Sequence, residues 1–411
     1  MSVELMPLGT ACHMACEYCY QEPQREAGNT NARGAYDIEL MIKNGLRLGG
    51  VLTVFGGEAL LVPKRDLERI VEASFNRFGR SSIQTNGDLI DDGHIKLFKR
   101  FNVAVGVSID GPGELNSLRV DRRTGDANDS TERTMINIKR LRAETIPVSI
   151  ITTLHRANGT GSNLSRLKDW GGWLASIGIP YVNIHNLESE SWYIKQKFAL
   201  SPKEETEAML SLAEFVEDNP VLRWAPFIAM KNLLQSNQDD VNCIWHHCDP
   251  LTTPAVQAVL ADGSMTNCGR VAKEGIPWVK PDQAGYERYI SLYQTPQELG
   301  GCKDCRFFLM CGGECPGTGF GDDGPDWRLK TDHCGVLMTL FEFYESRLLK
   351  DRTVPLSLHP NRKRMEAEMI RLFTQGRRPS NFVQLLGSEE ITHSDTPHQD
   401  SHGDHHDAQN T

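Results

Sequence analysis

The sequence lacks several features that would place it in familiar classes of protein. Across 411 residues, no apolar run approaches the roughly 20 residues that a membrane-spanning helix needs. The start, Met1–Thr10, has no basic region followed by an apolar core, so we expect no signal peptide. A net charge of −10 provides no basic surface for nucleic acid or an anionic membrane. The sequence therefore predicts a cytoplasmic protein with neither nucleic acid nor membrane as a partner.

Cysteine is present 11 times, and its distribution favours metal binding over disulfides. Disulfide scaffolds are typically short and secreted. This chain is long, has no expected export signal, and carries its cysteines in tight clusters. We therefore interpret the cysteines as metal ligands in a reducing compartment.

The first 186 residues alternate short apolar runs with helical patterns. The apolar runs, expected to be strands, cover 3–8, 51–55, 81–85, 103–109, 147–154 and 181–186. Helical spacing of apolar residues recurs in 36–48, 65–78, 91–100, 131–142 and 163–177. This order predicts an α/β fold of parallel βα units, with ligand sites at the carboxyl ends of the strands. Periodicity alone leaves open whether the sheet closes into a barrel.

Composition divides the chain into three regions. Residues 1–235 contain the βα units and a further helix, opened by the capping box Ser201-Pro202-Lys203-Glu204. In 240–347, Gly, Cys and Pro become dense, which is typical of a small domain that metal holds together. The His- and Asp-rich segment 376–411 is polar, and we expect it to be disordered.

Cys12, Cys16 and Cys19 have the spacing C-x3-C-x2-C and directly follow the first expected strand. Three thiolates can hold three irons of a 4Fe–4S cubane and leave the fourth iron open. An open metal position is what substrate chemistry requires. The alternative is a zinc site with a more distant fourth ligand, for which His13 is a candidate.

This spacing, with the aromatic Tyr18 just before the last cysteine, resembles the radical S-adenosylmethionine superfamily. The resemblance implies a partial (β/α)6 barrel whose open iron binds the amino and carboxylate groups of S-adenosylmethionine. Reductive cleavage of that cofactor would give a 5′-deoxyadenosyl radical, which removes hydrogen from a substrate carbon.

Motifs that close the next three strands strengthen the resemblance. They are Gly56-Gly57-Glu58, Gln84-Thr85-Asn86-Gly87 and Ser108-Ile109-Asp110-Gly111, with Arg119 downstream. The resemblance implies that the first motif contacts the methionine amino group, Ser108 the ribose region and Arg119 the cofactor carboxylate. The implied cofactor-binding residues are Tyr18, Gly56, Gly57, Glu58, Gln84, Asn86, Ser108, Asp110 and Arg119. No catalytic base is identified from the sequence.

The remaining cysteines are similar in order to the SPASM domain, the auxiliary-cluster domain of peptide-modifying radical enzymes. The pattern is C-x2-C-x5-C-x3-C at Cys302, Cys305, Cys311 and Cys315, with Gly263-x4-Cys268 upstream. The resemblance implies two auxiliary 4Fe–4S clusters, one held by Cys243, Cys248, Cys268 and Cys315, the other by Cys302, Cys305, Cys311 and Cys334. If Cys243 is instead an ordinary buried cysteine, the first of these has an open iron. Structural zinc is the alternative for the whole set.

The resemblance implies maturation of a ribosomally made precursor peptide, by tyramine excision as in the spliceases, crosslinking or epimerisation. The alternative is an anaerobic sulfatase-maturing enzyme that forms formylglycine, but those enzymes carry aspartate where this chain has Gly269. An iron–sulfur protein that only transfers electrons is the alternative of another class. Implied partners are the precursor peptide, a separate leader-recognition protein, and a reductant such as flavodoxin or ferredoxin.

Replacing Cys12, Cys16 and Cys19 together with Ala should abolish formation of 5′-deoxyadenosine from S-adenosylmethionine. Iron should fall by about four atoms per chain, because one cubane loses its ligands. Iron analysis and chromatography of anaerobic reactions with dithionite provide the measurements. Retained cleavage by the triple variant would refute the assignment of this loop.

Overall fold

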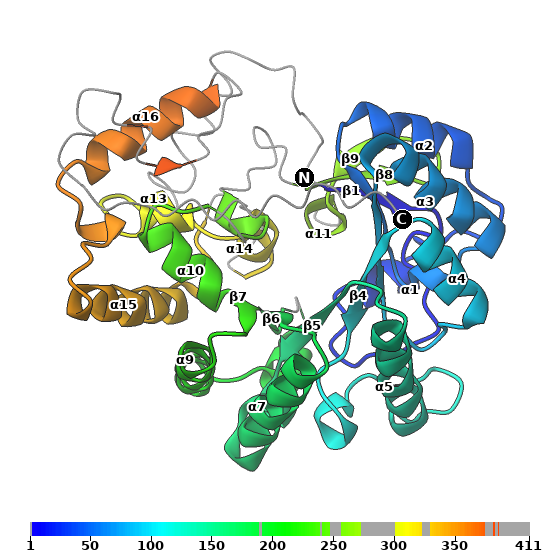
Figure 1. Ribbon diagram of the computed structural model, residues 1–411, viewed down its shortest axis with the longest axis horizontal. Helices are drawn as coiled ribbons and strands as arrows, with labels where there is room; N and C mark the ends of the chain where they lie inside the picture. Colours follow the sequence, from blue (N-terminus) through cyan, green and yellow to red (C-terminus); the bar gives the residue numbers. More distant parts are fainter. Residues whose placement is uncertain are drawn as a thin grey trace, which may run out of the picture.

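The computed structural model describes residues 2–188, 191–238, 241–246, 256–272, 301–322, 329–374, 381, 382 and 385. Within these ranges the fold is built on one nine-stranded sheet, with helices over its outer face (Figure 1). No helix in the described part of the chain is long and apolar enough to cross a membrane. Cys248 lies outside the described residues, as does most of the predicted tail.

All six predicted strands are present, and they pair in parallel in the order of the sequence. They are β1 (Ser2–Met6), β2 (Val51–Val54), β3 (Ser81–Thr85), β4 (Val103–Ser108), β5 (Val148–Leu154) and β6 (Tyr181–Asn186). The sheet order is β7-β6-β5-β4-β3-β2-β1-β8-β9, so its two outer strands do not pair with each other. The α/β fold with a partial barrel is therefore confirmed.

The predicted helices also form, with ends that differ by a few residues. They are α2 (Ile38–Arg47), α3 (Lys64–Phe78), α4 (Asp92–Arg100), α5 (Asn128–Ala143), α7 (Gly161–Ser176) and α9 (Pro202–Asp218). The capping box that opens α9 is complete, because Ser201 N–H donates to Glu204 Oε2 (2.8 Å) and Glu204 N–H to Ser201 Oγ (3.3 Å). The shorter helices of this half are α1 (Glu22–Glu26), α6 (Arg156–Gly159), α8 (Trp192–Phe198) and α10 (Phe227–Leu234).

Three strands extend the sheet beyond the sequence-based expectation. β7 (Arg223–Ala225) pairs with β6 at one edge. At the other edge β8 (Val256–Leu260) runs parallel to β1 and forms a hairpin with β9 (Met265–Asn267). The region predicted as a separate cysteine-rich domain therefore contributes two strands to the barrel sheet. β7 and β9 have only three residues each, too few to show a clear period.

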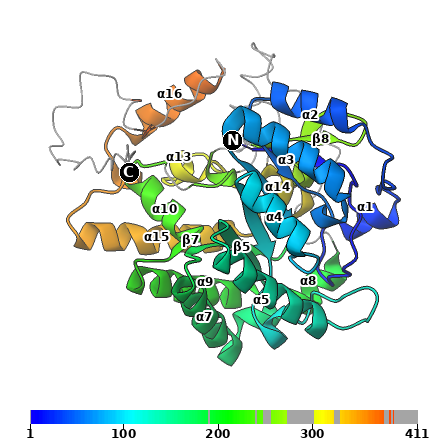
Figure 2. The same ribbon diagram turned by 45° about the vertical axis from the view of Figure 1, so that its right-hand side comes forward.

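The described part of the C-terminal region is mostly helical. Its helices are α11 (Gly269–Ala272), α13 (Phe308–Cys311), α14 (Pro316–Asp322), α15 (Cys334–Lys350) and α16 (Arg362–Thr374). Helix α15 packs against α9 and α10, and it lies beside α10 in both views (Figures 1 and 2). This contact joins the cysteine-rich region to the two helices that precede and follow β7.

Three residues of segment 376–411 lie within the described ranges. Phe382 and Leu385 are buried in the main core, and Asn381 Oδ1 accepts a hydrogen bond from Ser236 Oγ (2.7 Å). Two apolar side chains in a polar segment give no periodic signal, so a single sequence does not reveal their burial. The other residues of this segment lie outside the described ranges.

Two adjacent glycines of α7 provide a test of the packing between this helix and β7. A Cβ on Gly171 would overlap the ring of Trp224, which is fully buried, whereas a Cβ on Gly172 meets nothing within 4 Å. Gly171→Ala should therefore lower the free energy of unfolding by about 1–3 kcal/mol. Gly172→Ala should raise it by about 0.5–1 kcal/mol, because alanine favours a helix. Denaturant titration of both variants checks the pair, and equal effects would contradict it.

Candidate functional site

The loop that carries the first three cysteines follows β1 and is held by backbone hydrogen bonds from two sides. On one side, Ala15 N–H donates to Val120 O (2.7 Å). On the other, Gly57 N–H, which follows β2, donates to Gly9 O (3.0 Å). The path of the loop is therefore set by two segments that are distant from it in the sequence.

The double glycine after β2 is required by this close approach of backbones. A Cβ on Gly57 would overlap the carbonyl oxygens of Thr10 and Ala11, and one on Gly56 would lie 2.5 Å from Gly9 O. Gly56 also has a φ of +134°, which L side chains rarely adopt. The two glycines thus let the β2 segment approach the cysteine loop itself.

The Glu58 carboxylate links the end of β2 to the end of β3. Its side chain is buried and accepts hydrogen bonds from Leu60 N–H (2.8 Å), Thr85 Oγ1 (2.6 Å) and Asn86 N–H (2.8 Å). Burial raises the pKa of Glu58, and these hydrogen bonds oppose the increase. The residue therefore holds two of the three motifs together at the cysteine loop.

A cluster of buried charges lies at the end of β4. Asp110 is fully buried and accepts hydrogen bonds from the Tyr18 hydroxyl, from Arg119 Nη2 (3.1 Å) and from Thr153 N–H (2.9 Å). His155 Nε2 lies 3.4 Å from Asp110 Oδ2. Burial alone would raise the pKa of Asp110, but Arg119 and His155 outweigh it and hold this pKa well below its usual range.

Three of these residues, Tyr18, Asp110 and Arg119, are among those implied by the sequence resemblance, and the structure brings them together. His155 was not anticipated. It is fully buried, follows β5 directly, and its ring lies 5.5 Å from that of Tyr18 between centroids. Its place at the carboxyl end of a parallel strand is the one signal that could have identified it.

The remaining implied cofactor residues lie at the ends of β3 and β4. Gln84 Nε2 donates to Ser108 Oγ (2.7 Å), which joins the two strands on one face. Asn86 Oδ1 accepts from Asp88 N–H (3.0 Å), while the buried Asn86 Nδ2 has no hydrogen-bond partner within the described ranges. A buried donor of this kind can serve an acceptor on a bound molecule.

The thiols of the first loop are surrounded by protein. Burial raises the pKa of Cys12 and of Cys16 to about 12, while Arg25 Nη2 donates to Cys19 Sγ (3.8 Å). Iron binds thiolates, so cluster assembly here must release protons. His13, the alternative zinc ligand, has its Nε2 3.0 Å from Asp88 Oδ2.

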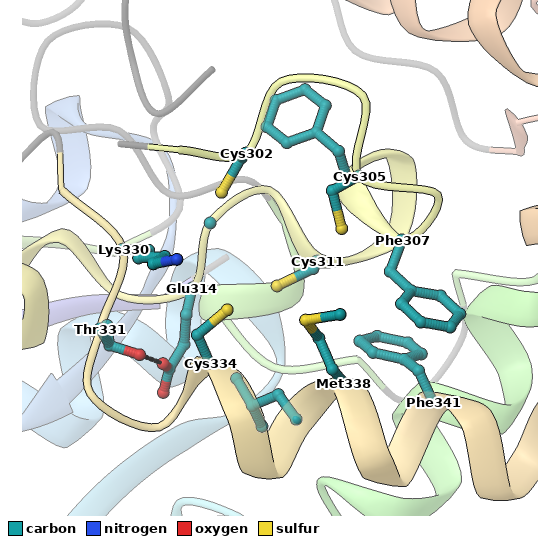
Figure 3. Close-up of a pocket in the computed structure, with 13 residues that line it drawn as sticks. Cys302, Cys305, Phe307, Cys311, Glu314, Lys330, Thr331, Cys334, Met338 and Phe341 are labelled. Atoms are coloured by element: carbon teal, nitrogen blue, oxygen red, sulfur yellow. Dashed lines mark hydrogen bonds between the residues drawn. The ribbon is translucent and has the colours of Figure 1, made fainter. Parts of the chain in front are cut away.

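Four cysteines of the C-terminal region line one pocket, as the resemblance implied for the second auxiliary cluster. Figure 3 shows the sulfurs of Cys302, Cys305, Cys311 and Cys334 around a common hollow. The lining is otherwise rich in apolar groups, including Phe307, Phe308, Leu337, Met338 and Phe341. Soft thiolate donors in an apolar surround suit an iron–sulfur cluster.

The other proposed auxiliary ligands are only partly brought together. Cys268 precedes α11 and Cys315 precedes α14, and these helices are joined because Arg270 Nη2 donates to Thr318 Oγ1 (2.9 Å). Cys243 lies just before a 3-10 turn, Ile244–His246, whereas Cys248 is outside the described residues. The composition of this second ligand set remains a prediction.

Residues 6–160 match the Radical SAM superfamily. The chain is 23% identical over 379 residues to a cysteine-type anaerobic sulfatase-maturating enzyme of Clostridium perfringens, a match that covers 85% of this chain and 97% of the relative. A serine-type anaerobic sulfatase-maturating enzyme of Bacteroides thetaiotaomicron is 35% identical over 125 residues, which are 28% of this chain and 30% of the relative.

Solved structures of similar fold include enzymes with peptides bound. The enzyme anSMEcpe with bound AdoMet and Cp18Cys peptide matches with a TM-score of 0.67 and 19% identity, over 85% of this chain and 98% of that one. Streptococcus suis SuiB bound to precursor peptide SuiA matches with a TM-score of 0.56 and 14% identity, over 81% of this chain and 75% of that one. At these identities the likeness establishes the fold.

Gly57→Ala tests the contact between the β2 segment and the cysteine loop. The added methyl group must displace the loop, so we expect the variant to lose about four irons per chain and its cleavage of S-adenosylmethionine. Gly172→Ala, whose methyl group meets nothing within 4 Å, is the matched control and should keep wild-type iron content and cofactor cleavage. Wild-type iron content and cleavage in Gly57→Ala would show that the loop tolerates displacement.

Proposed function

The chain belongs to the radical S-adenosylmethionine superfamily through its residues 6–160, and we propose that it removes a hydrogen atom from a peptide substrate. It is an enzyme that uses reductive cleavage of S-adenosylmethionine. The observation that carries the proposal is the combination of a three-thiol loop with a separate four-thiol pocket in one chain. A protein that only carried electrons would need no radical SAM domain.

The loop thiols of Cys12, Cys16 and Cys19 would hold the first cluster. When bound, this cluster and S-adenosylmethionine supply the radical chemistry. The chain supplies position and charge. Asp110 fixes the Tyr18 hydroxyl and the Arg119 guanidinium beside the loop, where Arg119 can pair with the cofactor carboxylate.

Cys302, Cys305, Cys311 and Cys334 would hold an auxiliary cluster with all four thiolates. A fully ligated cluster leaves no iron open to substrate, so its role would be electron transfer or shaping of the site. The set of Cys243, Cys248, Cys268 and Cys315 would hold a second auxiliary cluster. A reductant such as flavodoxin or ferredoxin would supply the electron for each cleavage.

The substrate we favour is a ribosomally made precursor peptide, recognised with the help of a separate protein. The similar structure of SuiB with its precursor peptide supports this class. The second candidate is a sulfatase, and its support is a match over nearly the full length of a maturating enzyme. Gly269, at the position where maturases carry aspartate, weighs against that candidate.

Parallel assays with the two kinds of peptide distinguish the two candidate functions. Purified enzyme is incubated anaerobically with dithionite, S-adenosylmethionine and either a precursor peptide or a sulfatase-derived peptide. Mass spectrometry follows the loss of tyramine, a crosslink or formylglycine. Modification of the precursor peptide alone supports our proposal, and formylglycine formation would overturn it in favour of sulfatase maturation.

Cys311→Ala separates cofactor cleavage from peptide modification. The variant should lose about four irons, because one auxiliary ligand set is incomplete. It should still cleave S-adenosylmethionine slowly, since the first three cysteines lie in a separate loop. Peptide product should disappear. Wild-type product yield from a Cys311→Ala protein that lacks this cluster would show that the auxiliary cluster takes no part in turnover.

A further inference from the structure

Helix α16 belongs to none of the three regions that the sequence composition distinguishes, and none of the roles above uses it. The helix packs against α13, and its Met365 and Met369 side chains are buried in the main core. Two cationic side chains of its first turn, Arg362 and Lys363, reach chain segment 302–305 instead. This segment supplies two of the four thiols around the pocket of Figure 3.

Segment 302–305 forms a tight turn between its two cysteines. Cys305 N–H donates to Cys302 O (3.1 Å), and Asp304 has a φ of +62°, in the left-handed region. Aspartate tolerates this region better than most residues but less well than glycine. Contacts from elsewhere in the chain therefore help to keep the turn in this shape.

Two side chains of α16 hold the turn from outside. Arg362 Nη1 donates to Cys305 O (3.2 Å), and Lys363 Nζ donates to Asp304 Oδ1 (2.6 Å). The Arg362 side chain is 11% exposed, whereas those of Lys363 and Asp304 are 69% and 67% exposed. Water and salt screen the second contact more than the first, so Arg362 makes the stronger attachment.

The Arg362 guanidinium is itself fixed in place, and it contacts the turn at a junction. Glu366, one turn further along α16 and 12% exposed, forms an ion pair with it. Cys305 O also accepts from the N–H of Phe308 (3.1 Å), the first residue of α13, which ends at Cys311. A carbonyl oxygen has two lone pairs and can accept both bonds. Arg362 therefore binds where the turn with two thiols meets the helix that carries a third.

We propose that Arg362, assisted by Lys363, is a positioning residue for the auxiliary cluster of this pocket; this inference rests on the proposed function of the pocket as a cluster site. By holding the Cys305 carbonyl, Arg362 keeps the thiols of Cys302 and Cys305 in place. A cluster is lost when its thiolates separate from iron, so a turn that is held from outside releases iron more slowly. Helix α16 is thus part of the cluster site although it carries no cysteine.

Three variants separate the contact with the turn from the packing of the helix. Arg362→Met combined with Glu366→Met removes the contact and leaves no unpaired buried charge, so this double variant should fold. Arg362→Lys keeps a long cationic donor and should restore the contact in part. Arg371→Met is the matched control, because Arg371 is 52% exposed and pairs with Glu368 of the same helix.

The first measurement is the rate of iron release from the dithionite-reduced holoenzyme to a ferrous chelator. Cys311→Ala, which should lack this cluster, identifies the phase that belongs to it. In the double variant this phase, about four irons, should be about tenfold faster or more, with Arg362→Lys in between. Arg371→Met should stay within about twofold of wild type.

Two results of this measurement would overturn the role of Arg362. One is release by the double variant within about twofold of wild type. The other is an equal acceleration for the irons of every cluster, since α16 would then only support the fold as a whole.

The second measurement is a spectroscopic signature that a general loss of stability would not change. The electron paramagnetic resonance signal of this cluster is the part of the reduced wild-type spectrum that Cys311→Ala lacks. Before chelator is added, the double variant should hold wild-type iron but show a changed signal, because two ligands shift. Arg371→Met should show the wild-type signal.

The two measurements also separate the positioning role from the cluster itself. An unchanged signal in the double variant would contradict the positioning role while leaving the proposed cluster intact. Wild-type iron content in Cys311→Ala would instead count against the proposed cluster, and the role of Arg362 would fall with it.

Discussion

The close contact between the β2 segment and the cysteine loop is the constraint on which the site depends. Two carbonyl oxygens of the loop lie where the Cβ of any residue other than glycine would be at position 57. From there Glu58 reaches the end of β3, and the far side of the loop is fixed by the backbone at Val120. Three loop cysteines and two strand ends thus share one rigid arrangement.

Much of this arrangement could be predicted from the sequence. Alternating apolar runs and helical periods gave all six parallel strands, because each βα unit repeats the same pattern. Cysteine spacing indicated the first loop, and the resemblance implied the four cysteines that line the pocket of Figure 3. The resemblance added Tyr18, Asp110 and Arg119, which the structure joins in one buried charge cluster.

Other parts of the structure carry little signal in a single sequence. His155 contacts Asp110 only because β4 and β5 are adjacent, and no motif surrounds it. Phe382 fills the core from a segment that is polar overall. The Glu4 side chain of β1 accepts a hydrogen bond from Gly269 N–H, which lies 265 positions further along the chain. Contacts between distant segments of the chain decide all three cases.

The pairing of β8 with β1 has a consequence for how such proteins can recombine. All five residues of β1, from Ser2 to Met6, have a partner in β8. A chimera joined near residue 240 would therefore exchange one edge of the barrel along with the cysteine-rich region. The β8–β9 hairpin of the incoming region would have to match β1 of the retained barrel in register and twist. Shuffling of C-terminal regions among relatives is thus restricted by compatibility along this strand as well as by cluster ligands.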